Sequence, residues 1–520
     1  MENVALPQAM IETVTSAADW VVVLPLVLAL MGASLALMLR KNSGMSFMLA
    51  VLVVVAIIAC EVSLLLRVYD TGPLSMTMGK WLPPFGISFA ADLFGASFAL
   101  AAAVVALIVL FYAQGERGEE QEGDGFHSMV LLLLAGVTGS FLTGDLFNLY
   151  VWFEVMLISS FGLIVLGGRP LQLDGAVKYG FLNFLATALF LLALGLTYGL
   201  LGTLNMADIM RVAPAANPAA MAGVAALLLL AFGMKAAAFP VNAWLPASYH
   251  TPPAVVSALF AGLLTKVGVY ALLRSLVVLL PASRDFLEPV LIAVAVGTLL
   301  IAPLGAIAET NLRRAIGFFV IGGIGAVLAG IAIPSLAGVS GAGLYVFHAI
   351  LTMTALYLVV GLIERRTGQT DTRHMGGLYA ASAPLSIVFL VLVLATAGVP
   401  PFLGFWPKLL LLQAGTGEGG WVGGVITVAL LINAVLTLIA GSRIWAHIFW
   451  RNAPETTVVA TEPRNAGSWM RFAATGVLVA GIVAAGLWPN GLFEALKSGA
   501  PDILDPSRYV EAIGLAGDTP

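Results

Sequence analysis

The sequence predicts an all-α polytopic membrane protein with about fourteen spanning helices, two of them broken by proline. Of its 520 residues, 60% are hydrophobic and only 10% are charged, whereas a soluble domain carries about 25% charged residues. The mean hydropathy is +1.00. Apolar runs of membrane length recur along the whole chain. The spans are therefore expected to form one bundle, and not a soluble domain with an anchor.

Each predicted span is an apolar run of about 20 residues or more, the length that crosses a bilayer. The first run lacks the basic flank of a cleavable signal sequence, so we expect it to be a retained helix. The tail after residue 489 is interrupted by Pro and Gly and is not expected to form a long lateral helix. The runs are 20–39, 46–67, 86–113, 127–145, 147–167, 176–201, 219–239, 253–276, 286–307, 312–333, 341–363, 381–412, 421–449 and 469–488.

Proline interrupts the seventh and twelfth of these runs, at Pro240 and Pro246 and at Pro400 and Pro401. Proline removes an amide donor, and lipid cannot satisfy the carbonyl that it frees, so such breaks belong against protein or a hydrated cavity. The breaks lie five helices apart, which predicts two inverted five-helix repeats, helices 4–8 and 9–13. The expected units are residues 1–126 (helices 1–3), 127–276, 277–450 and 451–520 (a cytoplasmic loop, helix 14 and the tail).

Glu154 and Lys235 are ionisable residues inside predicted spans, where a charge costs roughly 2.5–3.5 kcal/mol on insertion scales. Lys235 stands just before the first break. An opposite charge nearby would keep both groups ionised, and a desolvated lysine releases its proton when that partner moves away. Arginine does not release protons in proteins, so lysine suits such a switch. The alternative is a carboxylate that is paired only for packing.

Lys266 and Lys408 lie in two further spans. Lys266 has more than a helical turn of apolar sequence on each side, so it is placed at mid-depth. Lys408 directly follows the second break, as the expected counterpart of Lys235. The alternative for both is a side chain that snorkels to the interface, and Lys408 lies nearer a helix end. The lysines and Glu154 suggest a row of proton-accepting groups across the membrane.

His348 lies between the two lysine-bearing regions and can pass a proton in either direction, or it can simply be a hydrogen-bonded packing residue. Ser257 and Thr265 can hold bridging water or pack helices together. Three aspartates are candidates for a cation site by position alone, and the first of them can instead cap or pair at the end of its helix: Asp92, Asp145 and Asp174.

Composition also excludes several classes of function. The net charge of −4 implies no nucleic-acid partner, and the single cysteine, Cys60, permits no disulfide framework. No His or Cys cluster has metal or haem spacing, so neither a metal nor a cofactor is expected and a direct redox enzyme is disfavoured. An inert scaffold whose buried charges serve only assembly is the remaining alternative. Lys and Arg are about twice as frequent in the loops opposite the termini as on the terminal side, where Arg274 is counted, which predicts both termini outside the cytoplasm.

Four stretches resemble the antiporter-like family, the large membrane subunits of Mrp cation/proton antiporters, complex I and membrane-bound hydrogenases. The resemblance covers roughly residues 85–450. It is strongest in FGMKAAAFPVNAWLPASYHTPPAVVSALFAGLLTKVGVYALLR at 232–274, and it extends to FNLYVWFEVMLISSFGL at 147–163, KYGFLNFLATALFL at 178–191 and GVPPFLGFWPKLLLL at 398–412. Details of the first stretch resemble the D-type subunits of the Mrp branch, with complex I subunits as the runner-up. The A-type subunits have a long C-terminal extension that this sequence lacks.

This resemblance implies a proton-translocating subunit in a multisubunit Na+/H+ antiporter of a bacterial plasma membrane. Its partners would be subunits of the A, B, C, E, F and G types, and its ions would be protons and sodium. The alternative is a proton-pumping subunit of a redox complex. The family's midplane relay would fall on Glu154, Lys235, Lys266, His348 and Lys408. Many relatives carry a lysine one turn after the histidine, where this chain has Thr352-Met353, so His348 and water would have to bridge the middle.

Overall fold

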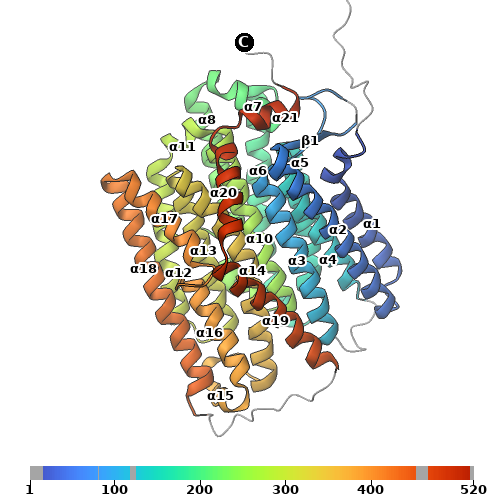
Figure 1. Ribbon diagram of the computed structural model, residues 1–520, viewed down its shortest axis with the longest axis vertical. Coiled ribbons are helices and arrows are strands. Elements are labelled where there is room, and N and C mark those ends of the chain that lie inside the picture. The colour runs from blue at the N-terminus through green and yellow to red at the C-terminus, as the bar shows by residue number, and fades with distance from the viewer. Residues whose placement is uncertain (1–15, 80, 117–123, 453–465, 516–520) are drawn as a thin grey trace, which may run out of the picture.

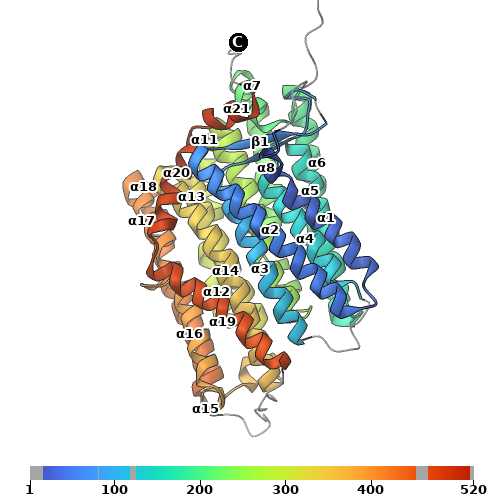
Figure 2. The same ribbon diagram turned by 45° about the vertical axis from the view of Figure 1, so that its right-hand side comes forward.

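The computed structural model describes residues 16–79, 81–116, 124–452 and 466–515, which fold into a helical bundle with one small β-hairpin (Figure 1, Figure 2). The elements are η1 (Asp19–Val22), α1 (Leu24–Met38), α2 (Ser43–Thr71), β1 (Leu74–Thr77), β2 (Ser88–Ala91), α3 (Leu93–Glu116), α4 (Phe126–Leu142), α5 (Leu146–Val165), α6 (Pro170–Leu201), α7 (Met206–Val212), η3 (Ala213–Ala215), α8 (Pro218–Ala236), α9 (Trp244–Tyr249), α10 (Ala254–Leu272), η4 (Leu273–Leu279), α11 (Pro281–Phe286), α12 (Glu288–Ala308), α13 (Leu312–Ala332), α14 (Leu336–Thr367), η5 (Thr372–His374), α15 (Leu378–Ala381), α16 (Ala383–Ala397), α17 (Phe405–Glu418), α18 (Gly420–Trp445), η6 (Ala446–Trp450), α19 (Ala466–Leu487), α20 (Asn490–Leu504) and α21 (Ser507–Ile513).

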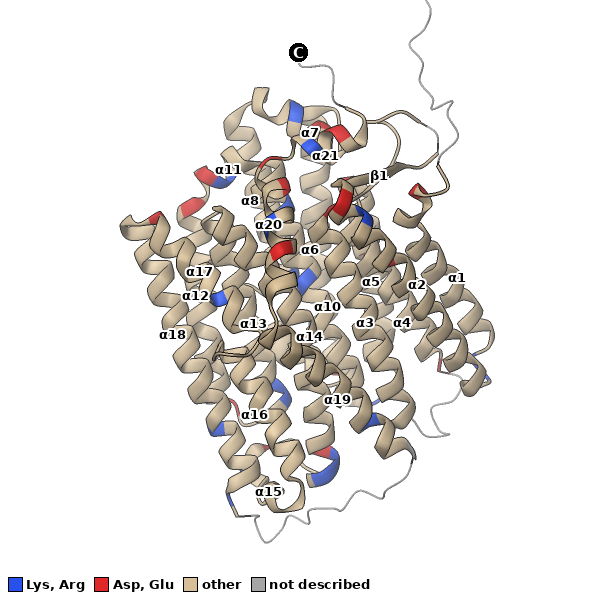
Figure 3. Ribbon diagram, viewed as in Figure 1, with Lys and Arg blue, Asp and Glu red and all other residues tan. Residues whose placement is uncertain are grey.

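The prediction of an all-helical polytopic membrane protein is confirmed. In the described part of the chain, 11 helices are long and apolar enough to cross a membrane. Three shorter apolar helices, Leu24–Met38, Phe126–Leu142 and Ala383–Ala397, coincide with parts of the other three predicted runs, 20–39, 127–145 and 381–412, to within one residue. Charged residues gather mainly toward the two ends of the bundle, and few lie between (Figure 3). This distribution is what hydrocarbon around the middle of the bundle requires.

A short antiparallel hairpin, β1–β2, joins α2 to α3 and was not predicted from the sequence. Leu74 pairs with Ala91 and Thr77 with Ser88. The predicted span 86–113 was therefore wrong at its start, because α3 begins only at Leu93. Asp92 marks that start, since its Oδ1 accepts a hydrogen bond from the Gly95 amide at 2.7 Å and so satisfies a free donor of the first turn.

Both predicted helix breaks are present. α8 ends at Ala236 and α9 begins at Trp244, while α16 ends at Ala397 and α17 begins at Phe405. Each break opens with the hydrogen-bond pair of a Schellman motif, which satisfies carbonyls at the end of a helix. The four bonds are Ala238 N to Gly233 O (2.9 Å), Ala237 N to Met234 O (3.1 Å), Val399 N to Leu394 O (3.0 Å) and Gly398 N to Ala395 O (3.2 Å). The left-handed residue is Ala237 (φ 61°) in the first break and Gly398 (φ 85°) in the second.

Two further features occur twice along the chain. α6 and α14 are both 32 residues long, and each ends at a left-handed glycine, Gly202 or Gly368. The residue that caps the preceding helix forms an isolated β-bridge with a residue just beyond the long helix. These bridges join Asp145 to Asn205 and Asn311 to Asp371. The first lies near α7, and the second near α15 at the opposite end of the bundle (Figure 1).

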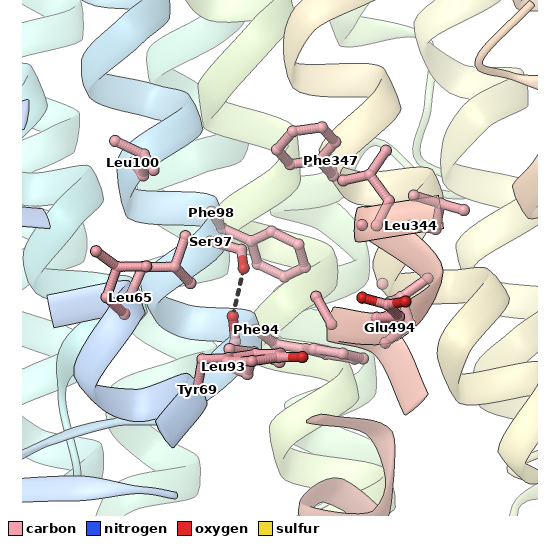
Figure 4. Close-up of a pocket in the computed structure, with 16 residues that line it drawn as sticks. Leu65, Tyr69, Leu93, Phe94, Ser97, Phe98, Leu100, Leu344, Phe347 and Glu494 are labelled. Atoms are coloured by element: carbon pink, nitrogen blue, oxygen red, sulfur yellow. Dashed lines mark hydrogen bonds between the residues drawn. The ribbon is translucent and has the colours of Figure 1, made fainter. Parts of the chain in front are cut away.

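The last described helices lie on the outside of the bundle. α19 packs against α3 and α14, and α20 continues along the same two helices toward α21 (Figure 1). The tail beyond residue 489 thus forms two short helices, α20 and α21, with Pro501 inside the first. A half-open apolar groove of about 510 Å³ lies between α2, α3, α14 and α20 (Figure 4). Its lining includes Phe94, Phe347 and Glu494, and none of the predicted relay residues.

Candidate functional site

The five predicted relay residues come from five different elements. Lys235 lies at the end of α8, Lys266 in α10, His348 in α14 and Lys408 at the start of α17, with exposures of 4%, 1%, 0% and 5%. Glu154 of α5 is only half-buried. None of the three lysines reaches solvent, so the snorkelling alternative given for Lys266 and Lys408 does not describe them in this structure.

Lys235 faces a small cavity with room for about one water molecule. Its Nζ stands 4.8 Å from the ring centroid of Phe153, a cation–π contact. Trp244, the first residue after the break, lines the same cavity, and its indole Nε1 donates to Met234 O at 3.0 Å. This bond ties the start of α9 to the last turn of α8 beside the lysine.

Glu154 lies close enough to act electrostatically on Lys235. The two side chains do not form a direct ion pair, and Glu154 Oε1 is buried without a hydrogen-bond partner among the described residues. The expected pair is therefore a loose one. A carboxylate near an ammonium without direct contact leaves room for a proton or a water molecule to come between them.

α6 supplies a polar wall to the Lys235 cavity. Tyr179 and Asn183 both line it. The Tyr179 hydroxyl is hydrogen-bonded to Ser160 Oγ at 2.6 Å, and the Asn183 amide donates to Tyr179 O at 2.8 Å. These residues lie in stretches that carried the resemblance, but no charge marked them for attention in the sequence.

Lys266 is hydrogen-bonded within its own helix. Its amine donates to Ala261 O and to Thr265 Oγ1, the latter at 3.3 Å. Thr265 thus contacts Lys266 directly. Ser257 does not contact it, because its hydroxyl donates to Tyr249 O at 2.6 Å and so ties the end of α9 to the start of α10.

His348 lies between Lys266 and Lys408 and is within electrostatic reach of both. Its Nδ1 is hydrogen-bonded to Thr352 Oγ1 at 3.1 Å, while the buried Nε2 has no partner in the described part of the chain. The ring lies against Gly404 of the second break, where a Cβ would come within 2.9 Å of Cε1 and Nε2. A free ring nitrogen at a helix break is placed to accept or donate a proton there.

Lys408 lies in α17, after the second break, and its side chain reaches back to cap the C-terminal end of α16. Its amine donates to Thr396 O at 3.2 Å and to Ala397 O at 2.8 Å, the last carbonyls of α16. A cation at a helix C-terminus is stabilised by the helix dipole as well as by these bonds. The two breaks therefore correspond to each other as expected, but Lys408 does not occupy the position in the second break that Lys235 occupies in the first. When the Schellman bonds are superposed, Lys235 matches Thr396.

The three aspartates do not join the relay. Asp145 caps α5 by accepting from the Asn148 amide at 2.8 Å. Asp174 forms an exposed ion pair with Lys178 at 2.5 Å on the surface of α6. Asp92 caps α3 and is ion-paired to Arg274, which lies 2% exposed in the π-helical turn η4. Arg274 falls inside the predicted run 253–276, and it was wrong to count it among the charges of the terminal side. No group of three metal-ligating side chains occurs in the ranges that the structure describes.

Glu61 is a buried carboxyl that was not singled out from the sequence. It lies 0% exposed in α2, accepts a hydrogen bond from Thr138 Oγ1 at 3.3 Å, and leaves Oε2 without a partner among described residues. Its signal was the one that marked Glu154, an acidic residue inside a predicted span. Its helix packs against α1, α3 and α4.

The chain matches the family model "NADH:quinone oxidoreductase/Mrp antiporter, TM" over residues 143–437. It is 34% identical over 493 residues to the D-type subunit of a Na(+)/H(+) antiporter from Bacillus subtilis, covering 95% of this chain and 99% of that one. The fold is similar to a chain in the Mrp complex of a Dietzia species (TM-score 0.87, 27% identity, 96% and 100% covered). It is also similar to a chain of the membrane-bound sulfane sulfur reductase, an archaeal respiratory membrane complex (TM-score 0.84, 26% identity, 95% and 99% covered).

The chain belongs to the NADH:quinone oxidoreductase/Mrp antiporter transmembrane family. Within that family it groups with the D-type subunits of the Mrp Na+/H+ antiporters, as the resemblance predicted. It is accordingly a multi-pass membrane component of an ion transporter and not an enzyme.

Proposed function

We propose that this protein moves protons along the row Glu154, Lys235, Lys266, His348 and Lys408, within a Na+/H+ antiporter that also contains subunits of the A, B, C, E, F and G types. The observation that carries the proposal is the Lys235 site. A buried ammonium there faces a cavity with room for about one water molecule, near a carboxylate that it does not contact. Such a lysine can bind a proton as the carboxylate approaches and lose it as the carboxylate withdraws.

The row continues through the rest of the bundle. Lys266 and Lys408 are both within electrostatic reach of His348, whose free Nε2 faces the second break. Gly268 of α10 packs directly on Ala236 of α8, which brings the helix of Lys266 against the end of the helix of Lys235. In the absence of a charged residue at Thr352, the uncharged middle of the relay depends on His348 and water.

We also propose fourteen spans, with the eleven long helices joined by the three shorter ones, and two inverted repeats at 127–276 and 277–450. The paired Schellman motifs, the paired 32-residue helices and the paired β-bridges support this internal symmetry. An odd number of spans per repeat turns the second copy upside down. The two bridges lie at opposite ends of the bundle, as inversion requires (Figure 1).

The proposed orientation places both termini outside the cytoplasm of a bacterial cell. The end of the bundle that carries α15 holds Arg313, Arg314, Arg365, Arg366 and Arg373. Removing Arg274 from the loops of the opposite end strengthens the imbalance of basic residues, because that side chain lies inside a span. Cytoplasmic loops carry the excess of Lys and Arg, so the α15 end is assigned to the cytoplasm.

A second candidate function is proton pumping within a redox-driven complex. The likeness to the sulfane sulfur reductase chain favours it, since that protein belongs to a respiratory membrane complex. Purification of the tagged protein with its native partners separates the two functions: small membrane subunits of an antiporter support the first, and iron–sulfur or flavin subunits support the second.

The proposed relay is tested with Glu154→Gln and Lys235→Ala. We expect either change to abolish Na+/H+ exchange in vesicles, read with a pH-sensitive dye, while the complex still assembles on a native gel. Asp174→Asn and Lys178→Ala are the matched controls, because they remove the exposed ion pair of α6, and surface pairs contribute about 0–1 kcal/mol. Exchange at the wild-type rate in both test variants would remove Glu154 and Lys235 from the mechanism. Loss of assembly in both would favour the scaffold alternative.

A further inference from the structure

A stripe of three buried polar side chains runs along α10 and η4 from the relay toward one end of the bundle. Lys266, Tyr270 and Arg274 follow one another at intervals of four residues, which places them on one face of the helix. Their exposures are 1%, 3% and 2%. The stripe begins at a relay lysine and ends against Tyr509 of α21, so it leads out of the row toward the end of the bundle that carries α21 (Figure 1).

Hydrogen bonds oppose proton transfer along this stripe. The Tyr270 hydroxyl donates its only proton to Phe141 O at 3.0 Å and accepts from Arg274 Nε at 2.9 Å. The Lys266 amine points the other way along the helix, to Ala261 O. A proton on Lys266 therefore has no hydrogen-bonded connection to Tyr270 among the described residues.

A fixed positive charge closes the end of the stripe. Arg274 is ion-paired with Asp92, and both side chains are almost fully buried. Arginine keeps its proton in proteins, so this charge is permanent. Tyr509 of α21 covers the guanidinium, with its ring centroid 5.0 Å from Arg274 Cζ and only 1% of the residue exposed. The carboxyl of Asp502 in α20 lies within electrostatic reach of the pair.

We propose that Arg274, held by Asp92 and covered by Tyr509, is an electrostatic plug that stops protons on Lys266 from leaving toward the α21 end of the bundle. Protons then pass on to His348 and remain coupled to sodium. This inference rests on the proposed function for the protonation of Lys266. Eight residues of helix span about 12 Å. Removing one unit of positive charge at that distance in a protein interior, which leaves the carboxylate of Asp92 uncompensated, changes the rate of an approaching proton about tenfold.

The test uses the complete antiporter complex in liposomes and measures proton leak without sodium, driven by a potassium diffusion potential. We expect Arg274→Gln to raise this leak about tenfold, since Asp92 then attracts protons that Arg274 repelled. Asp92→Asn leaves the cation in place, so its leak should not exceed that of wild type. Arg274→Lys retains a positive charge and should stay close to wild type. Equal leaks in the Gln and Asn variants would indicate simple loosening and would overturn the plug.

Arg274→Gln and Asp92→Asn each leave one buried charge unpaired, which can prevent assembly of the complex. Variants of Tyr509 test the plug without removing either charge. Tyr509→Ala uncovers the guanidinium and should raise the leak, whereas Tyr509→Phe keeps the ring and should not. An unchanged leak in Tyr509→Ala would show that the Tyr509 ring is not part of the plug. The double variant Lys266→Ala, Arg274→Gln should leak no more than wild type, and a persistent leak there means that the plug does not act on Lys266. Failure of the proposed relay is detected separately, as normal Na+/H+ exchange in Glu154→Gln. The leak measurements test only the plug.

Discussion

The two helix breaks share a backbone and differ in how they hold a cation. Both open with the same Schellman hydrogen bonds after α8 and α16. In the first, Lys235 precedes the break, faces a cavity and contacts an aromatic ring, and no carbonyl among the described residues accepts a hydrogen bond from its amine. In the second, Lys408 follows the break and donates to two carbonyls at the end of α16. The same backbone arrangement thus accompanies a loosely held lysine in the first break and a tightly held lysine in the second.

The difference shows that a helix break provides a place for a buried lysine, and that the neighbouring side chains decide how tightly the lysine is held. The end of a helix offers free carbonyls and a negative dipole wherever it occurs. Around Lys235, the walls come from aromatic and amide side chains of α5 and α6. Around Lys408, the helix end itself supplies the acceptors, and His348 is the neighbouring titratable group.

The strongest way to test this comparison is to keep the charge and remove the ability to give up a proton. Lys235→Arg should lower Na+/H+ exchange at least tenfold, because arginine does not release protons. Lys408→Arg should lower it only about threefold if that residue acts largely by capping carbonyls. Dye-reported exchange in vesicles, normalised to the amount of protein, gives both values. Equal losses would show that both breaks depend on proton release in the same way.

A second test ranks the uncharged link against the lysines that flank it. His348→Ala should weaken exchange less than Lys266→Ala or Lys408→Ala, because water can replace an uncharged group, whereas removal of a lysine deletes a site where charge can rest. The expected losses are about threefold for the histidine and at least tenfold for each lysine. Complete loss in His348→Ala with mild effects at both lysines would reverse this order.

A third test uses two matched positions, Gly404 and Ala243, which coincide when the breaks are superposed on their hydrogen bonds. A Cβ at Gly404 would press on Ala395 O and on the His348 ring, so Gly404→Ala should cost about 1–3 kcal/mol and should lower exchange by displacing the imidazole. Ala243→Gly should leave exchange near wild type, because the first break already accommodates a side chain there. Thermal unfolding and exchange of the two purified variants make the check, and similar exchange in both would separate His348 from Gly404.

The smallest expected effect concerns the left-handed residue itself. Ala237 has φ 61°, a conformation that costs an L residue about 1–2 kcal/mol relative to glycine. Ala237→Gly should therefore raise the thermal stability of the complex slightly. Gly398→Ala should lower it, and further than backbone strain alone would, because the new Cβ comes 2.6 Å from Lys408 Cδ. A melting temperature that shifts in the same direction in both variants would contradict the comparison.

The sequence revealed features that depend on local chemistry. Pro240 and Pro401 mark helix breaks because proline cannot continue a helix hydrogen-bond ladder, and the structure places a break at each. Isolated lysines in apolar runs likewise identified buried cations, since few other arrangements tolerate them. The same reasoning would have found Glu61, whose surroundings in sequence resemble those of Glu154.

Features that depend on contacts between distant segments could not be read in this way. Arg274 stands near the end of the predicted run 253–276 and was counted with the charges of the terminal side. Only its pairing with Asp92 and its cover by Tyr509 explain its burial. The hairpin β1–β2 is too short to produce a clear alternation of apolar and polar residues. Whether Lys408 caps carbonyls or faces a cavity likewise depends on the spatial course of the second break.

The position of α21 has a consequence for biogenesis. Ser75, in the hairpin between the second and third helices, donates to Ala512 O at 2.5 Å, across 437 residues of chain. Tyr509, three residues earlier, covers a charge in the middle of the sequence. The ribosome makes these contacts available only after Tyr509 and Ala512 have been translated, so the amino-terminal helices wait in the membrane with that flank uncovered. A chain truncated before Tyr509 would still contain the earlier spans and yet lack these contacts, which gives a cell's quality control a late and local defect to detect.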